Sequence, residues 1–357
     1  MTARLVWPSR GRRVRTDAGG VPAYVEAPTR RQAAFVAAFG DAPGRMPAVA
    51  GEANLLVQGD NADALATLMP DLEGRVDLVY ADPPFNSGPQ GRGMPYANDM
   101  DHDLWLDFMD ERIALLVRAL RPGGSLYLHL DENEAHYAKV LLDEHLGREA
   151  FVREIVWRIG WVSGYKTTQR NFVRNHDTIL YYVKPGGTVT FEKVWLPRPA
   201  DYRRRDGATA KSPGLPLEDT WNASATDPLH SIQITSFSGE KTGFATQKNE
   251  ALVDRIVMSS SRPGDLVLDP FAGSGTTGAV CHKRGRRYVI CEADPDAVDL
   301  CQRRLTDVVD GTDRHGITAA AGWRGGGGFV RVAMEPAAGH GDPADATAAA
   351  PSPVPGP

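Results

Sequence analysis

The chain has 357 residues, of which 42% are hydrophobic and 24% charged, and its formal net charge is −5. This length allows one large domain, or one domain with an insertion. An acidic total does not exclude a nucleic-acid partner, because the positive surface that binds phosphates can be local. No apolar run is long enough to span a membrane, and the first residues lack the apolar core of a signal peptide, so we expect no membrane partner.

The cysteines also bear on the class of protein. Cys281, Cys291 and Cys301 are the three in the chain, and they form no CxxC pair. Three thiols cannot pair fully, so we expect reduced, buried side chains in a cytoplasmic protein.

The first 50 residues are rich in Arg, Ala, Pro and Gly and show no sustained periodicity. This composition predicts a flexible, solvated extension, although its arginines could contact phosphates. Regular patterning starts at Asn54, where a short strand is followed by a helix over 62–69. Asp60 and Asn61 stand at the position of a helix N-cap.

A second strand over 76–81 ends at Asp82-Pro83-Pro84-Phe85, called the tetrad below. Proline has no N–H, so the carbonyl groups beside it lose their usual partners. A carboxylate, a carbonyl and an aromatic ring together suit a flat ring that bears an exocyclic amine. The ring would stack on Phe85, while Asp82 and a proline carbonyl accept the amine hydrogens. The alternative is a proline turn that ends a parallel strand, with Asp82 as a cap.

The next elements continue the alternation of strands and helices. A loop over 86–101 is either a flap over a site or a plain surface loop. An amphipathic helix over 104–120, a strand over 125–131 and a helix over 132–146 that stops at Gly147 follow. Strands alternating with helices predict an α/β fold with a parallel sheet.

The stretch 151–211 differs in charge from the rest. It holds 12 Lys and Arg against five Asp and Glu, a balance of +7, with ten Trp, Tyr and Phe interleaved. Short strands are expected in REIVWRI, HDTILYYV and TVTFEKV, and residues 212–245 read as loop. Basic residues mixed with aromatic ones favour a surface that binds nucleic-acid backbone. A peripheral β-subdomain with a solvated basic face is the alternative.

Regular patterning returns at Thr246. A helix over 250–261, a strand in LVLDP, a glycine loop (FAGSGTTG) that opens a helix, a strand in RRYVICEAD and a helix over 295–308 are expected in that order. An edge strand in GFVRVAM would follow. The Ala/Pro/Gly-rich end of the chain is expected to be disordered.

The glycine loop fits two classes of enzyme. Gly273 to Gly278 satisfies GxGxxG after a strand, and Glu292 ends the next strand. This pattern is the fingerprint of a dinucleotide site, so by itself it leaves a nicotinamide-dependent dehydrogenase open. Three histidines, His129, His136 and His145, lack the spacing of metal ligands, and we expect no metal.

The tetrad, the sequence DPFAGSGTT and the Thr246-Gln247-Lys248 segment resemble motifs of the β class of S-adenosylmethionine-dependent amino-group DNA methyltransferases. The resemblance runs from about Asn54 to Leu305 and includes the order of the motifs. It implies a Rossmann-like three-layer α/β sheet, circularly permuted so that the catalytic half precedes the cofactor half, with an inserted target-recognition region. The family commonly has Pro after the lysine; here Asn249 stands there and can cap the next helix instead.

The resemblance assigns roles to single residues. The catalytic set is the tetrad, Asp82, Pro83, Pro84 and Phe85. The residues assigned to S-adenosylmethionine are Asp60, Thr246, Gln247, Lys248, Asp269, Phe271, Gly273, Gly275, Thr276 and Glu292. Among them Asp60 would contact the adenine amine of the cofactor, Glu292 its ribose, and the segment that includes Lys248 its methionine carboxylate.

The resemblance also implies an activity and a domain plan. A tetrad that begins with Asp goes with methyl transfer to N6 of a flipped adenine in double-stranded DNA, whereas Ser in that place is more usual for cytosine N4. Cytosine-N4 or RNA methylation and a non-catalytic DNA-binding subunit stay open, as do a homodimer and a restriction endonuclease partner. The expected parts are an extension (1–50), a catalytic half (51–155), a target-recognition region (156–240), a cofactor half (241–308) and a C-terminal extension with a disordered tail (309–357).

Overall fold

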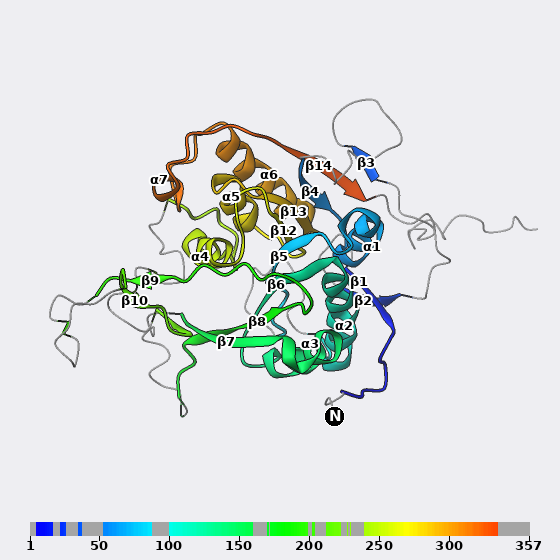
Figure 1. Ribbon diagram of the computed structural model, residues 1–357. Helices are drawn as coiled ribbons and strands as arrows, with labels where there is room; N and C mark the ends of the chain where they lie inside the picture. The colour runs from blue at the N-terminus through cyan, green and yellow to red at the C-terminus, as the bar shows by residue number, and fades with distance from the viewer. Residues whose placement is uncertain are drawn as a thin grey trace, which may run out of the picture.

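A computed structural model gives the fold (Figure 1). It describes residues 5–16, 22–25, 35–37, 53–87, 100–159, 170, 172–198, 202–203, 212–222, 227, 229 and 239–334. The predicted flap over 86–101 lies mostly outside these ranges, and so does the predicted disordered tail beyond Met334. Among the described residues, no helix is long and apolar enough to cross a membrane.

A ten-stranded sheet runs through the described part of the molecule, in the order β11-β7-β8-β6-β5-β12-β13-β4-β14-β3. The strands from β6 to β14 in this order pair in parallel, whereas β8 is antiparallel to both β6 and β7. The strands span Phe35–Ala37 (β3), Asn54–Gln58 (β4), Val76–Ala81 (β5), Leu120–Leu130 (β6), Phe151–Arg158 (β7), His176–Val183 (β8), Thr220–Trp221 (β11), Leu266–Asp269 (β12), Arg287–Glu292 (β13) and Phe329–Met334 (β14).

Helices cover both faces of this sheet. They span Asn61–Leu72 (α1), His102–Ala119 (α2), Ala135–Leu146 (α3), Glu250–Ser260 (α4), Thr276–Lys283 (α5), Pro295–Val309 (α6) and Thr318–Ala321 (α7), with a 3-10 turn at Arg148–Ala150. Helices α1, α2 and α3 share one core with one face of the strands, and α4, α5 and α6 share a second core with the other face. Successive strand residues alternate between the two cores, as Leu55 and Leu56 do. The predicted three-layer α/β sheet is confirmed.

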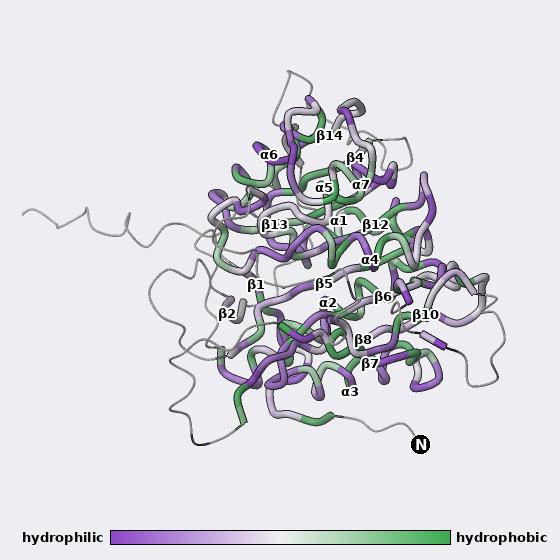
Figure 2. The backbone as a smooth tube through the Cα atoms, turned by 90° about the vertical axis from the view of Figure 1, so that its left-hand side faces the viewer, coloured by the Kyte–Doolittle hydropathy of each residue, from purple (hydrophilic) through white to green (hydrophobic). Residues whose placement is uncertain are grey.

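The amphipathic patterns place the helices as expected, and Figure 2 shows the alternation of hydrophobic and hydrophilic stretches along them. The helix ends also follow their capping residues. Asp60 accepts the amide N–H groups of α1, and Asn249 accepts Leu252 N at 2.8 Å at the start of α4. Asn249 therefore replaces the proline of the family motif as a cap. Gly147 ends α3 with a φ of 87°, which glycine adopts without strain.

The two predicted halves meet at the middle of the sheet. Strand β5 pairs in parallel with β12, with Leu78 opposite Val267. From β5 the chain leads through α2 to β6 on one side, and from β12 through α5 to β13 on the other. The carboxyl ends of β5 and β12 thus lie at a topological switch point, where clefts form. Asp82 and Asp269 therefore lie at the carboxyl ends of neighbouring parallel strands.

Strand β4 lies in the other half from the one its sequence position suggests. It pairs with β13 and β14, two strands beyond β12. The first strand of the predicted catalytic half is thus a structural part of the cofactor half, because its neighbours are set by the sheet and not by chain order.

The N-terminal strap, residues 5–16, is packed against the domain, so the prediction of a solvated extension is wrong for this segment. Trp7 and Val14 are buried in the first core. Arg10 pairs with Glu144 at 2.6 Å, and Arg15 pairs with Glu111 at 2.7 Å. The strap includes β1 (Arg13–Thr16), which pairs with β2 (Pro22–Val25). Its arginines form ion pairs with acidic side chains on α2 and α3. These partners are far apart in the sequence, so no periodic pattern predicts the pairing.

The positively charged stretch 151–211 forms only some of the strands that its sequence predicts. Strands β7 and β8 join the main sheet, while Phe191 to Val194 of the predicted TVTFEKV strand is irregular. A separate two-stranded sheet joins β9 (Trp195–Leu196) to β10 (Leu215–Pro216). At the other end, β14 is not an edge strand, because the short β3 pairs with its outer side.

Candidate active site

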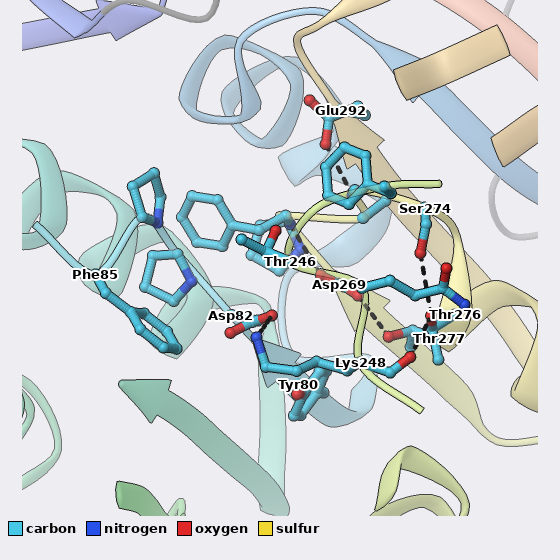
Figure 3. A pocket seen from close by; sticks show the side chains of 18 of the residues that line it. Tyr80, Asp82, Phe85, Thr246, Lys248, Asp269, Ser274, Thr276, Thr277 and Glu292 are labelled. Carbon is cyan, nitrogen blue, oxygen red and sulfur yellow. Dashed lines mark hydrogen bonds and ion pairs between the residues drawn. The ribbon is translucent and has the colours of Figure 1, made fainter. Parts of the chain in front are cut away.

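A cavity of about 490 Å³ opens at the carboxyl ends of β5 and β12. It is lined by both halves of the domain, and Figure 3 shows Phe85 and Glu292 on opposite sides of it. Of the 14 site residues predicted from the sequence, 12 line this cavity: Asp82, Pro83, Pro84, Phe85, Thr246, Gln247, Lys248, Asp269, Phe271, Gly273, Thr276 and Glu292. The sheet therefore joins motifs that are 191 residues apart, Asp82 and Gly273.

The Asp82 carboxylate is half engaged. Its Oδ2 accepts Lys248 Nζ at 2.6 Å, and its side chain is 16% exposed. Its Oδ1 is buried and has no hydrogen-bond partner among the described residues; His129 Nδ1 lies 3.9 Å away. Lys248 thus balances the charge through Oδ2, while Oδ1 has no hydrogen-bond partner among the described residues.

The rest of the tetrad completes one wall of the cavity. The indole N–H of Trp105 donates to the Pro84 carbonyl at 3.0 Å, so this carbonyl is already engaged. Phe85 is partly buried against the first core, and Lys248 Nζ lies 4.9 Å from the centre of its ring. The ring lines the cavity and is available for stacking.

The glycine loop forms the opposite wall. Gly273 has a φ of +50°, and its N–H donates to Glu292 Oε2 at 2.8 Å. A Cβ at Gly273 would come within 3.0 Å of the Phe244 ring, which also lines the cavity. Burial raises the pKa of the Glu292 carboxyl, although backbone N–H groups lower it. Bare backbone beside a buried acid suits an adenosyl ligand.

The Asp269 side chain holds the glycine loop in place through two hydrogen bonds. Its Oδ1 accepts Phe271 N at 2.9 Å and its Oδ2 accepts Thr277 Oγ1 at 2.5 Å. Burial raises the pKa of this carboxyl to about 7. Both oxygens are used within the protein, so Asp269 holds the loop that lines the cavity.

Lys248 connects the two walls. Its carbonyl accepts Thr276 Oγ1 at 3.0 Å, which ties its segment to the start of α5, and its ammonium reaches Asp82 (Figure 3). The Lys248 segment therefore links the start of α5 to the tetrad.

The sequence matches the DNA methylase family of the N6/N4 type over residues 76–303. The chain belongs to this DNA methylase family. It is 31% identical over 264 residues to the DNA adenine methyltransferase YhdJ of Escherichia coli, covering 71% of this chain and 83% of that protein. It is 27% identical to the type II methyltransferase M.HpaI of Haemophilus parainfluenzae, covering 71% of this chain and 75% of that one.

Two further matches are more distant or partial. The chain is 26% identical to a probable type III restriction-modification Mod subunit, HindVI, of Haemophilus influenzae, and spans 54% of its length. Among solved structures, the M1.HpyAVI complex with S-adenosylmethionine is 22% identical with a TM-score of 0.47, and the match covers 70% of this chain and all of that one. S-Adenosylmethionine is the cofactor of the DNA methylase family to which this chain belongs, and the bare backbone of the glycine loop, the Glu292 carboxylate and the Lys248 cation fit this group.

Two of the residues assigned to the cofactor do not line the cavity of the methylase. Asp60 Oδ2 accepts Arg112 Nη2 at 2.7 Å and Thr16 N at 2.7 Å, and its Oδ1 caps α1. Both oxygens of Asp60 are therefore engaged within the protein, and neither is free for the predicted contact with the cofactor's adenine amine. Gly275 has a φ of +77°, and a Cβ there would lie 2.5 Å from Cys301 Sγ. Gly275 serves close packing of α6.

Sequence reasoning missed several residues that line the cavity. Thr16 and Pro22 come from the N-terminal segment, which carries no motif. Asp177 and Trp157 come from β8 and β7, within the stretch interpreted as a DNA surface. His129, considered only as a metal ligand, is fully buried and bonds Tyr80 OH at 2.9 Å and Asp177 Oδ2 at 3.2 Å. Among the described residues no cluster could hold a metal ion.

Proposed function

We propose that this methylase transfers a methyl group from S-adenosylmethionine to the exocyclic N6 of an adenine in double-stranded DNA. The observation that carries the proposal is that the tetrad and the cofactor loop line one cavity, with an unpartnered oxygen on Asp82. An amine inside a base pair cannot reach such a cavity, so the adenine must rotate out of the duplex.

The residues of the chain align the amine. Phe85 stacks on the flipped base, and Asp82 Oδ1 and the Pro83 carbonyl accept the two amine hydrogens. These contacts orient the amine so that its nitrogen lone pair could accept the methyl group that S-adenosylmethionine would supply. Because an adenine amine is a weak nucleophile, this alignment supplies much of the rate. The proton leaves to Asp82 or to water.

Adenine is favoured over cytosine by two observations. The tetrad begins with Asp, and the relative that is 31% identical is named a DNA adenine methyltransferase. Cytosine N4 presents the same kind of amine and is the second candidate.

The partners follow from the same proposal. We assign target recognition to residues 156–240, whose basic and aromatic residues suit DNA. We also propose that the protein acts in the cytoplasm. A restriction endonuclease partner is consistent with the names of the type II and type III relatives. A homodimer stays a prediction from the resemblance.

Single-molecule sequencing of DNA from cells that express the chain tests the proposal, with cells that express Asp82→Ala as the control. We expect N6-methyladenine at one short sequence, absent from the control. N4-methylcytosine at a fixed sequence would replace the adenine assignment, and the absence of any modified base would overturn the proposed activity.

A further inference from the structure

The wall of the cavity beside the tetrad carries a second unpartnered polar atom. Trp157 lines the cavity and is only 1% exposed, yet its indole Nε1 has no hydrogen-bond partner among the described residues. Of the buried side-chain atoms described as unpartnered, only Asp82 Oδ1 and Trp157 Nε1 belong to residues that line this cavity. A buried donor without an acceptor is costly, so such groups commonly await a ligand or water.

The Trp157 ring, the Phe85 ring and the Asp82 carboxylate lie around the same histidine. The His129 ring lies 5.2 Å from the Trp157 ring, edge to face, and 5.7 Å from the Phe85 ring. His129 Nδ1 is 3.9 Å from Asp82 Oδ1. His129 is itself held by Tyr80 and Asp177, so the ring against which Trp157 and Phe85 lie has a fixed position.

Asp177 does not take the indole hydrogen. It lies opposite Trp157 in the pairing of β7 with β8, but its Oδ2 bonds His129 and its Oδ1 bonds Arg174. Its nearest cross-strand carboxylate is engaged elsewhere, so Trp157 Nε1 has no acceptor across this pair of strands.

We infer that Trp157 donates its indole N–H to the ring nitrogen next to the amine of the target base, N1 in adenine. This inference rests on the proposed function and deepens it. The Asp82 acceptor matches an exocyclic amine, and the Trp157 donor matches an unprotonated ring nitrogen beside that amine. Adenine and cytosine both present this pair of groups. Guanine and thymine present a carbonyl beside a ring N–H, so each would meet Asp82 and Trp157 with the wrong polarity. Trp157 thus selects the class of base, and Asp82 the reacting amine.

The test uses duplexes that carry the sequence found in the sequencing experiment. The target adenine is replaced by 1-deazaadenine, which lacks the N1 acceptor, or by 3-deazaadenine as the matched control. An abasic site stands opposite the target, so that lost base pairing does not change flipping. We expect wild-type kcat/KM to fall about tenfold or more with 1-deazaadenine relative to 3-deazaadenine, the scale of one buried hydrogen bond.

Two variants locate that loss. Trp157→Phe removes the N–H and should respond to 1-deazaadenine and 3-deazaadenine alike. Trp221→Phe, a change of a buried tryptophan that lies in register with Trp157 on β11 and outside this cavity, should keep the wild-type ratio. Any intrinsic effect of the analogue on the amine is common to all three proteins and cancels in the comparison.

The outcomes separate this inference from the proposed function. A Trp157→Phe enzyme that discriminates against 1-deazaadenine as strongly as the wild type overturns the inference while leaving adenine methylation intact. If Trp157→Phe does not fold, as judged by thermal unfolding and cofactor binding, the equilibrium Kd of the wild-type chain for the two duplexes decides, because binding does not depend on the nucleophilicity of the amine. Equal Kd values overturn the inference, and weaker binding of the 1-deazaadenine duplex supports it. Absence of methyladenine with every substrate would instead contradict the proposed function.

Discussion

Two corners of the cavity, the segments that begin with Asp82 and with Asp269, have similar sequences, but their aspartates differ in exposure and in hydrogen-bond partners. Asp82-Pro83-Pro84-Phe85 follows β5, and Asp269-Pro270-Phe271 begins with the last residue of β12, its parallel neighbour. Asp82 is 16% exposed and keeps one oxygen unpartnered, whereas Asp269 is 2% exposed and has both oxygens bonded within its own loop.

The difference shows what gives an aspartate at a strand end its role. Both carboxylates stand where parallel strands end, and both precede a proline and an aromatic ring. Asp269 accepts hydrogen bonds from the Thr277 hydroxyl and the Phe271 amide, so both of its oxygens serve the fold. Asp82 has only Lys248, which balances its charge through one oxygen. The carboxylate with the incomplete set of internal partners is the one free to act on a substrate.

The largest expected effect is on catalysis by the first corner. Asp82→Ala should lower the rate of methyl transfer by about 10²–10³-fold or more, because the amine loses the acceptor that orients it. Affinity for S-adenosylmethionine, measured by calorimetry, should stay within a few-fold, and stability should change little. Activity within tenfold of wild type would remove Asp82 from the assigned role.

The second corner should respond in the opposite way. Asp269→Ala leaves the Phe271 N–H and the Thr277 hydroxyl without their acceptor inside the protein. We expect the free energy of unfolding, from denaturant titration, to fall by about 2–4 kcal/mol, one to two unsatisfied groups. If Asp82→Ala destabilises the fold as much as Asp269→Ala does, the contrast between the corners is wrong.

Phe85 tests whether the first corner holds a base. Phe85→Ala should weaken productive DNA binding by about 1–3 kcal/mol, the scale of one base–aromatic stack, while Phe85→Tyr or Phe85→Trp keeps activity. Thermal unfolding and methyl transfer measured on the same sample separate stacking from packing. A large drop in melting temperature with unchanged activity per folded molecule would show that the ring serves the core, against which it partly packs.

The smallest effect is the pH dependence that Asp269 adds. Burial raises its pKa to about 7 in the folded state from 3.8, so the folded state holds its proton more tightly than the unfolded state. Its contribution to stability is therefore complete below about pH 4 and is lost as pH rises through about 7. The loss between pH 6 and pH 7 should be about 1 kcal/mol.

Asp269→Asn isolates this contribution, because an amide can keep the bond from Phe271 N and cannot titrate. Unfolding curves at pH 6 and pH 7 should show a larger decrease for the wild type than for Asp269→Asn. Equal decreases in the two proteins would show that this carboxyl is ionised throughout.

The sequence by itself determined most elements and the location of the chemistry. Continuous apolar runs predicted the strands, helical periods with caps such as Asn249 predicted the helices, and the order of the tetrad and the glycine loop predicted the permuted arrangement. These features are local, or consist of motifs in a fixed order. Twelve of the 14 site residues that the resemblance implies line the cavity, although their individual contacts with cofactor and base stay predictions.

Only the tertiary structure decided which polar groups are already occupied. The chain gives no local signal that Arg112 and Thr16 engage Asp60, that arginines of the N-terminal strap meet acids on α2 and α3, or that the Trp157 indole is left unpartnered. Hydrogen bonds between residues far apart in sequence depend on which strands become neighbours. Residue type therefore names the candidates, and the balance of donors and acceptors in the folded protein determines which of them remain available to a ligand.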